Sequence, residues 1–362
     1  MLVSDPLSAD VKILLTGAGG SASANVLDSL RRSASNYWVL GADISHTRLH
    51  LSEAYERCLI PQANNSGYIQ SVNTALSEFG VDVLHVQPDP ELRVVSQHRN
   101  EIRASLFLPS NEAIQLASDK SRFADAMLTA GVPIPESVSF ESRTQIHEKV
   151  GDLLKRHERV WVRARVGAGA KASLPVSTAQ QAMNWIDWWT EEKDMTVQQF
   201  MASEMLPGSE FAFQSVWQDG NLIVGQARER LEYLYGFLAP SGQSSTPAIA
   251  RTVSSTNVTE LATKAIRALD SHPNGVYCVD IKCTQNGSPR VTEINAGRFF
   301  TTSNFFAAAG LNMPDMVMKA ATGTRLSPIG LSPLDDDLYW IRNVDMNYVL
   351  VSESELNKWK RF

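Results

Sequence analysis

Short apolar runs alternate with helix-patterned segments over the first third of the chain. Residues 11–17 (VKILLTG) and 37–43 (YWVLGAD) predict buried strands, and residues 22–32 between them have helical periodicity. Residues 81–89 (VDVLHVQPD) and 106–109 (LFLP) predict further strands. Because strands that alternate with helices favour a parallel sheet covered on both faces, we expect an α/β unit here.

The pattern changes near Asp119. A helix capped by Ser118 or Asp119 should run to Thr129, because both side chains can accept hydrogen bonds from a first helical turn. Residues 159–176 then predict a strand, a glycine-rich loop and a second strand. Antiparallel strands dominate residues 197–295, so the rest of the chain is expected to be α+β.

The sharpest local signal lies in residues 276–295 (VYCVDIKCTQNGSPRVTEIN). Asn286-Gly287 is a favoured pair for a two-residue hairpin turn, because both turn positions need positive φ. With that turn, Asp280 lies directly across from Glu293. Asn295 then lies on the same face, and the intervening apolar residues face the core.

Two facing carboxylates repel each other, so this arrangement needs compensation. A divalent cation between them would supply it, because Asp, Glu and Asn offer the oxygen ligands that Mg²⁺ prefers. The alternative is that both carboxylates are solvated on an exposed face, with Lys282 neutralising one of them.

Composition narrows the class of protein. The 362 residues suggest two or three domains. The net charge of −6 gives no bias toward nucleic acid or anionic lipid. Three cysteines without a CxxC pair predict neither a zinc site nor a disulfide framework. The first ten residues lack signal-peptide features, so we expect a cytoplasmic protein without a membrane or nucleic-acid partner.

The Asp119-Lys120 helix, the glycine-rich loop and the hairpin, in this order, resemble the ATP-grasp superfamily. The similarity is greatest to carbamoyl-phosphate-synthase-like carboxylate–amine ligases and extends from about Val11 to about Thr322. It implies a Rossmann-like domain at residues 1–117, a small lobe with the glycine-rich loop at 118–200, and a large lobe with the metal hairpin at 201–362.

The resemblance also implies an ATP site. Lys120 would contact the nucleotide phosphates, and Arg163 occupies the position of a second basic residue that is usually lysine. Arginine keeps the charge there but changes its geometry. The loop would fold over the phosphates with its backbone N–H groups and side chains, through Gly167, Gly169, Lys171 and Ser173.

Residues 202–213 (ASEMLPGSEFAF) resemble the hinge that holds adenine in this superfamily. Backbone groups of Glu204, Met205 and Leu206 would bond the base, and Glu210 would bind the ribose hydroxyls. The segment that starts at Gln198 (QQFM) is an alternative hinge.

The hairpin residues Asp280, Glu293 and Asn295 match the family's ligands for Mg²⁺, which Mn²⁺ could replace. Arg298 follows one residue later than the family's usual arginine and would clamp a phosphate or acyl phosphate.

Arg228 and Arg230 would face the substrate from one side of an extended strand. A surface ion-pair ladder with Glu229 and Glu232 is the alternative for these two arginines.

Together these features imply a ligase that phosphorylates a small-molecule carboxylate with ATP and joins it to an amine or ammonia. The resemblance also implies the homodimer common in the family. Two other functions stay open. Gly17, Gly19 and Ala22 fit a dinucleotide fingerprint with Asp43 at the end of the next strand, which would suit an NAD(P)-dependent oxidoreductase. Arg163 and the displaced Arg298 would also suit a non-catalytic ATP-binding scaffold.

Overall fold

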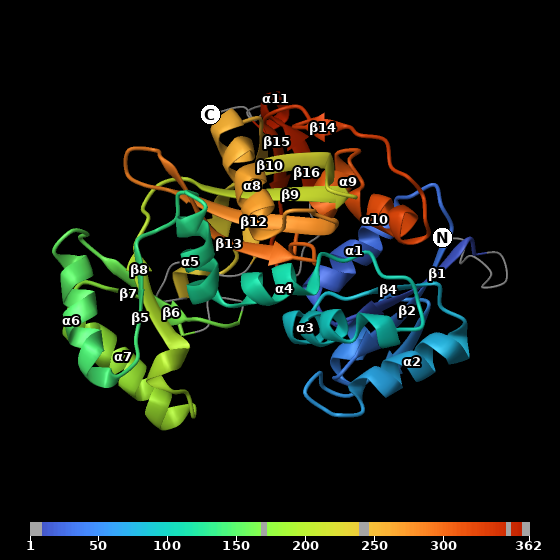
Figure 1. Ribbon diagram of the computed structural model, residues 1–362. Coiled ribbons are helices and arrows are strands. Elements are labelled where there is room, and N and C mark those ends of the chain that lie inside the picture. Colours follow the sequence, from blue (N-terminus) through green and yellow to red (C-terminus); the bar gives the residue numbers. More distant parts are fainter. Residues whose placement is uncertain (1–8, 168–171, 239–245, 345–348, 357–362) are drawn as a thin grey trace.

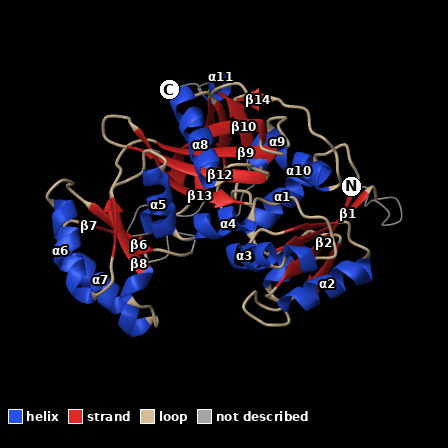
Figure 2. Ribbon diagram, viewed as in Figure 1, coloured by secondary structure: helices blue, strands red, loops and turns tan. Residues whose placement is uncertain are grey.

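The computed structural model describes residues 9–167, 172–238, 246–344 and 349–356, which form a mixed α/β protein with three sheets (Figures 1 and 2). The N-terminal sheet has the order β3-β2-β1-β4, and each neighbouring pair is parallel. Its strands are β1 (Val11–Thr16), β2 (Tyr37–Asp43), β3 (Glu56–Leu59) and β4 (Val83–His85). The prediction of a parallel sheet is therefore confirmed for this region.

Helices cover both faces of the N-terminal sheet because its strands are apolar on both sides. Helix α1 (Ser21–Arg31) packs on one face, and α2 (Tyr68–Phe79) and α3 (Asp89–Gln97) pack on the other. The predicted strand at residues 106–109 is wrong: only Ser105 forms a single bridge, to Val83. Pro109 has no N–H to donate to a ladder, and the chain turns there into α4 (Asn111–Ser118).

The small sheet has the order β5-β8-β6-β7 and is antiparallel. It consists of β5 (Ser137–Ser139), β6 (Val160–Ala164), β7 (Leu174–Val176) and β8 (Phe200–Glu204), with α6 (Arg143–Leu154) and α7 (Ala179–Glu192) packed on it. Its apolar residues form a hydrophobic cluster separate from those of the other two sheets.

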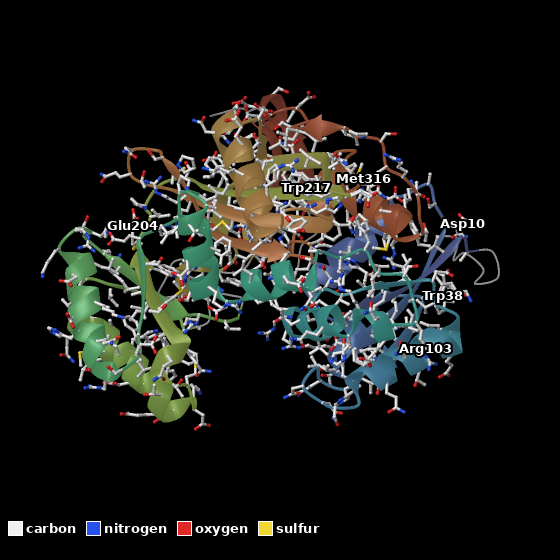
Figure 3. The ribbon with its side chains drawn as sticks, viewed as in Figure 1. Asp10, Trp38, Arg103, Glu204, Trp217 and Met316 are labelled. Atoms are coloured by element: carbon white, nitrogen blue, oxygen red, sulfur yellow. The ribbon has the colours of Figure 1, made fainter. Side chains whose placement is uncertain are left out.

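The large sheet has the order β13-β12-β9-β10-β11-β15-β16, with β14 (Gly330–Leu331) beside β10. Helix α8 (Thr256–Leu269) packs on one face, and α9 (Asn304–Ala308) and α10 (Met313–Ala321) pack on the other. Trp217, at the centre of this sheet, is fully buried (Figure 3). The remaining elements are β9 (Glu210–Gln218), β10 (Asn221–Tyr233), β11 (Pro247–Val253), β12 (Gly275–Cys283), β13 (Pro289–Ala296), β15 (Leu338–Ile341), β16 (Val349–Ser352) and α11 (Glu353–Leu356).

The β12–β13 hairpin has the predicted register at the site but not the predicted turn. Asp280 pairs with Glu293, whereas the turn is longer than two residues, because Cys283 pairs with Pro289 and Thr284 O accepts the N–H of Gly287. The longer turn shifts the register by one residue. A bulge at Thr292 shifts it back before Glu293 is reached.

None of the helices in the described ranges has the length and apolar character that crossing a lipid bilayer requires. The 3₁₀ helices are short and lie at Arg48–Leu51, Arg99–Glu101, Val197–Gln199 and Gly236–Leu238.

Helix α5 (Lys120–Thr129) joins the small sheet to the rest of the molecule, and its first residue is Lys120. The Asp119 carboxylate accepts the N–H groups of Ser121 and Arg122, as the predicted cap requires. It also pairs with Arg165 at 3.0 Å. Asp119 therefore fixes where the helix begins and so where the Lys120 side chain starts.

We predict that Asp119→Ala lowers the free energy of unfolding by about 1 kcal/mol, because two N–H groups of the first turn lose their acceptor. Asp119→Asn keeps an acceptor oxygen and loses only a partly exposed ion pair, so it should cost less than half as much. Urea unfolding followed by circular dichroism measures both. Equal losses for the two variants would show that the ion pair, not the cap, stabilises this junction.

Candidate active site

Two carboxylates of the large sheet face each other across the β12–β13 hairpin. Asp280 is buried, and its Oδ2 accepts a hydrogen bond from Asn295 Nδ2 at 3.1 Å. Each carboxylate has its own cation: Arg230 Nη2 lies 2.5 Å from Asp280 Oδ1, and Lys120 Nζ lies 3.4 Å from Glu293 Oε2. The alternative of two solvated carboxylates on an open face is therefore wrong.

The surroundings push the pKa values of the two carboxyl groups apart. Burial raises the pKa of Asp280 to about 6, against the ion pair with Arg230. Burial also acts on Glu293, but the charges of Lys120, Arg163 and Arg298 outweigh it and lower its pKa to about 2. Of the coupled pair, Asp280 is the member that takes up a proton first as the pH falls.

Lys120 and Arg163 reach this hairpin from two different segments. Lys120 Nζ donates to Gly167 O at 2.7 Å, at the start of the glycine-rich loop. Arg163 on β6 donates to Thr292 O at 3.4 Å, and burial lowers its pKa. Ser173 is buried where the loop ends, whereas Gly169 and Lys171 lie outside the described residues. The structure thus brings Lys120, Arg163 and Gly167 together beside Glu293.

The expected adenine hinge lies at the end of β8. Glu204 N donates to Glu136 O at 2.8 Å, and Met205 N donates to Arg159 O at 3.3 Å. These two N–H groups are therefore used within the protein. Within the described part of the chain the N–H of Leu206 has no such partner, which leaves it as the available donor of the three expected residues.

Glu210 is held by three neighbours rather than open to a ligand. Arg230 Nη1 lies 2.9 Å from its Oε1 and Lys282 Nζ lies 3.4 Å from its Oε2, and the hydroxyl group of Tyr233 donates to Oε1. Burial opposes ionisation, but the two cations keep the pKa of Glu210 below its usual value. Arg230 consequently bridges Glu210 and Asp280.

Arg228 lies two residues from Arg230 on the same strand face and is fully buried. Its Nη1 donates to Thr302 O at 3.3 Å, while Nε and Nη2 have no partner among the described residues. The guanidinium lies over the rings of Phe300 and Phe306, with its carbon 5.1 and 5.2 Å from their centroids. Burial lowers its pKa to about 9. This side chain is a buried cation without a carboxylate partner.

The alternative of a surface ion-pair ladder is wrong for these arginines. Glu229 points to the other face of the sheet and pairs with Arg251 at 2.7 Å, and Glu232 is exposed. The alternation of side chains along a strand explains the separation, since residues 228 and 230 share a face that residue 229 cannot reach.

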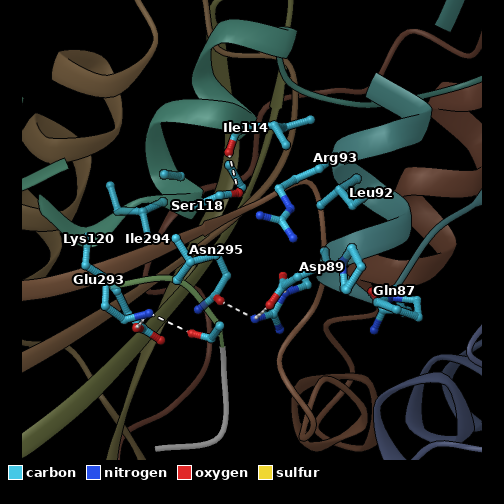
Figure 4. Close-up of a pocket in the computed structure, with 17 residues that line it drawn as sticks. Gln87, Asp89, Leu92, Arg93, Ile114, Ser118, Lys120, Glu293, Ile294 and Asn295 are labelled. Carbon is cyan, nitrogen blue, oxygen red and sulfur yellow. Dashed lines mark hydrogen bonds and ion pairs between the residues drawn. The ribbon is translucent and has the colours of Figure 1, made fainter. Parts of the chain in front are cut away.

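Arg298 closes the site on the side of the N-terminal sheet. It forms an ion pair with Asp89 at the start of α3 and donates to Asn295 Oδ1. These residues border a cavity of about 400 Å³ between α3, α4 and the hairpin (Figure 4). Lys120, Gly167 and Glu293 border the same cavity. The displaced Arg298 therefore still contacts the hairpin.

Several residues of this site were absent from the sequence prediction. Asp89 and Arg93 lie on α3, the helix that follows β4 at the carboxyl edge of a parallel sheet, where ligand-contacting residues commonly lie. That position was a usable signal. Tyr233 gave none, and Lys282 was considered only as a neutralising cation for the hairpin, because the contacts of both with Glu210 depend on strand register across the large sheet.

The glycine loop after β1 is filled by the protein itself. Asp43 accepts the N–H of Gly19 and the N–H of Ser45, each at 2.9 Å, so both of its oxygens are engaged. A Cβ atom on Gly19 would lie 2.5 Å from Arg48 O, so backbone covers the face that a pyrophosphate would need. Asp43 is therefore not available to bind the ribose hydroxyls, as an NAD(P)-dependent oxidoreductase would require.

Comparisons with known proteins agree on the architecture. No protein-family model and no curated protein matches the chain. Among solved structures, biotin carboxylase from Campylobacter jejuni superposes with a TM-score of 0.68 at 17% identity, over 91% of this chain and 75% of that one. An N5-carboxyaminoimidazole synthetase from Staphylococcus aureus in complex with ADP gives 0.68 at 16%, over 93% and 83%.

The L-amino acid ligase from Bacillus licheniformis gives a TM-score of 0.67 at 13% identity, over 92% of this chain and 79% of that one. These are all ATP-grasp proteins. The chain has the ATP-grasp fold. At these identities the likeness establishes the fold, so the chemistry of this ATP-grasp chain must be argued from its own residues.

The described residues contain no group of three or more His, Cys, Asp or Glu side chains that could hold a metal ion. The opposed pair Asp280 and Glu293 is supplemented by an amide, Asn295, rather than by a third carboxylate. All three offer oxygen atoms, the donor type that Mg²⁺ prefers.

His85, at the end of β4, supports the junction between the N-terminal sheet and the site. Its ring packs 5.6 Å from the ring of Phe299, next to Arg298. The side chain is buried, and burial lowers the pKa of His85 to about 4.

We predict that His85 makes the protein less stable in acid. In the unfolded chain its pKa is near 6.5, so between pH 6.5 and pH 4 only the unfolded state gains the proton. At pH 5 this costs about 2 kcal/mol of folding free energy relative to pH 7. Urea unfolding at both pH values should show a larger loss on acidification in the wild type than in His85→Gln, and the two changes should differ by this amount. An identical pH effect in both proteins would exclude His85 as its source.

Proposed function

We propose that this protein is an ATP- and Mg²⁺-dependent ligase that activates a carboxylate as an acyl phosphate and couples it to an amine or ammonia. One observation carries the proposal. Cations from separate segments of the chain converge on the opposed pair Asp280 and Glu293. These cations are Lys120, Arg163, Arg230 and Arg298. Such a convergence suits a polyphosphate chain that shares cations with acidic residues.

The fold neighbours support this chemistry. They include an L-amino acid ligase, a synthetase bound to ADP, and a biotin carboxylase domain bound to MgADP. We assign the N-terminal sheet to a Rossmann-like domain (residues 1–117), the small sheet to a small lobe (118–200) and the large sheet to a large lobe (201–362).

ATP would lie between the small sheet and the large sheet. Lys120 and Arg163 would contact its phosphates, helped by the glycine-rich loop from Gly167 to Ser173 with Gly169 and Lys171. The adenine would meet the hinge at Glu204, Met205 and Leu206, with the N–H of Leu206 as donor. Glu210 would have to give up its contact with Lys282 or Tyr233 in order to bind the ribose hydroxyls.

Asp280, Glu293 and Asn295 would hold Mg²⁺, or Mn²⁺ in its place. The fit rests on their donor set, since three oxygen-bearing side chains lie on one face of the hairpin. When bound, the ion would neutralise charge on the phosphate chain.

The protein's own residues would act by position and charge. Lys120 and Arg163 hold the γ-phosphate while an oxygen of the substrate carboxylate attacks its phosphorus and ADP leaves. Arg298, held by Asp89, faces the acyl phosphate and stabilises its negative charge. The amine nitrogen then forms the C–N bond, the C–O bond to phosphate breaks, and one amine proton passes to water.

Arg228 and Arg230 would bind the substrate acid. Arg228 is the stronger candidate, because its Nε and Nη2 groups have no acceptor among the described residues while Arg230 is already paired twice. A buried guanidinium with unused N–H groups fits an incoming carboxylate.

The proposal includes a cytoplasmic location and small-molecule substrates. It also includes a homodimer, because the biotin carboxylase domain of the Hydrogenobacter thermophilus 2-oxoglutarate carboxylase is a dimer.

The deciding experiment measures release of ADP and phosphate by purified protein across a matrix of acids and amines with Mg²⁺. We expect release only with particular acid–amine pairs. Glu293→Gln should reduce it at least about a hundredfold, since removal of a single charge-stabilising group commonly costs that much. The exposed Glu260→Gln is the matched control and should behave as wild type. Tight ATP binding without release for any pair would instead indicate a non-catalytic scaffold.

Arg228 allows a second prediction that separates function from stability. Arg228→Met removes a buried charge with a single hydrogen bond, so the free energy of unfolding should rise by about 1 kcal/mol or more. The same variant should lose turnover because the acid loses its partner. Urea unfolding and ADP release measure the two effects. A variant that is both less stable and fully active would contradict the assignment.

A further inference from the structure

The cavity beside the hairpin contains a cation that the proposed reaction has not used. Arg93, on α3, is half-buried, and Figure 4 shows its guanidinium pointing into the cavity. Its backbone carbonyl accepts from Gln115 and from Ser96, but its side chain has no ion pair or hydrogen bond to any described residue. Asp89, one turn earlier on the same helix, is occupied by Arg298.

The charges that border the cavity do not balance without a ligand. Of the described residues that border it, three are cations, Lys120, Arg298 and Arg93, and two are carboxylates, Asp89 and Glu293. Arg298 is paired with Asp89 and Lys120 with Glu293. Arg93 is therefore the excess charge, and a group bound in this cavity should bring one negative charge to it.

The rest of the lining indicates the body of that ligand. Leu92, Ile114, Ile294 and Ala296 are buried apolar residues on the walls of the cavity. A volume of about 400 Å³ accommodates a small organic molecule but no macromolecule. The cavity thus combines one unpaired cation with an apolar wall, and it opens onto Asn295 and Arg298.

We propose that Arg93 selects the nucleophile of the reaction: an amine that also carries a carboxylate and an apolar side chain, that is, an apolar α-amino acid. This inference rests on the proposed ligase function. The carboxylate would bind the guanidinium of Arg93, and the side chain would lie against Leu92 and Ile114. The amino nitrogen would then point toward Arg298, where the acyl phosphate is attacked. Arg93 is a specificity-determining residue, and ammonia or a neutral amine would not use it.

The test compares binding and turnover in Arg93→Gln and wild type. Isothermal titration calorimetry with leucine, and with leucine methyl ester as the analogue without a carboxylate, measures binding in the presence of Mg²⁺ and ADP. We expect wild type to prefer the free acid over the ester at least about tenfold, as a charged hydrogen-bonded pair implies. Arg93→Gln should bind leucine about tenfold more weakly and lose that preference, whereas Arg93→Lys should restore part of it.

Arg103→Gln is the matched control, because Arg103 is exposed on the N-terminal region away from the cavity (Figure 3). It should bind leucine as wild type does. Turnover with leucine as nucleophile should show a raised KM in Arg93→Gln with nearly unchanged kcat and KM for ATP. Unchanged leucine binding in Arg93→Gln, or equal losses for leucine and its ester, would overturn the inference. Arg93-dependent leucine binding without any ADP release would instead support Arg93 and reject the ligase function.

Discussion

The opposed pair of Asp280 and Glu293 is the constraint on which the rest of the site depends. Two carboxylates at paired positions of a hairpin repel strongly when buried, and the fold keeps them ionisable only by supplying cations. Those cations come from α5, from β6, from β10 and from the loop after β13. The small sheet and the large sheet must therefore be assembled before the hairpin charges are balanced. Electrostatics at this point connects two sheets whose apolar residues belong to separate clusters.

The second property of the site is a set of buried or half-buried guanidinium groups whose donors exceed the acceptors around them. Arg228 has one carbonyl partner, and Arg93 has no side-chain partner among the residues that the structure describes. Retaining such groups lowers stability, because desolvated charges are costly unless paired. In a chain with a net charge of −6, their concentration around one hairpin gives a local field opposite to that of the whole molecule. That field favours anionic ligands over neutral ones.

Residue types and their spacing predicted several elements of this structure, although the individual motifs are weak. Strands β1 and β2, helix α5 with its Asp119 cap, and the pairing of Asp280 with Glu293 were all evident from residue type and spacing. The pairing was correct although the turn was wrong, because the bulge at Thr292 cancels the extra turn residue. No sequence pattern here predicts such a bulge. The partners of Arg298 and Glu210 were also out of reach, since Asp89 and Tyr233 meet them only through tertiary packing.

The small sheet has a hydrophobic cluster of its own, which includes Phe140, Val162 and Ile186. Its cooperative opening need not expose the apolar residues of the other two sheets, so its backbone amides should exchange with solvent through a smaller free-energy gap. A nucleotide bound to the folded protein between β6 and β13 would raise the free energy of this local opening as well as that of global unfolding. Hydrogen exchange in the small sheet would then report ligand occupancy under native conditions, where global unfolding is rare.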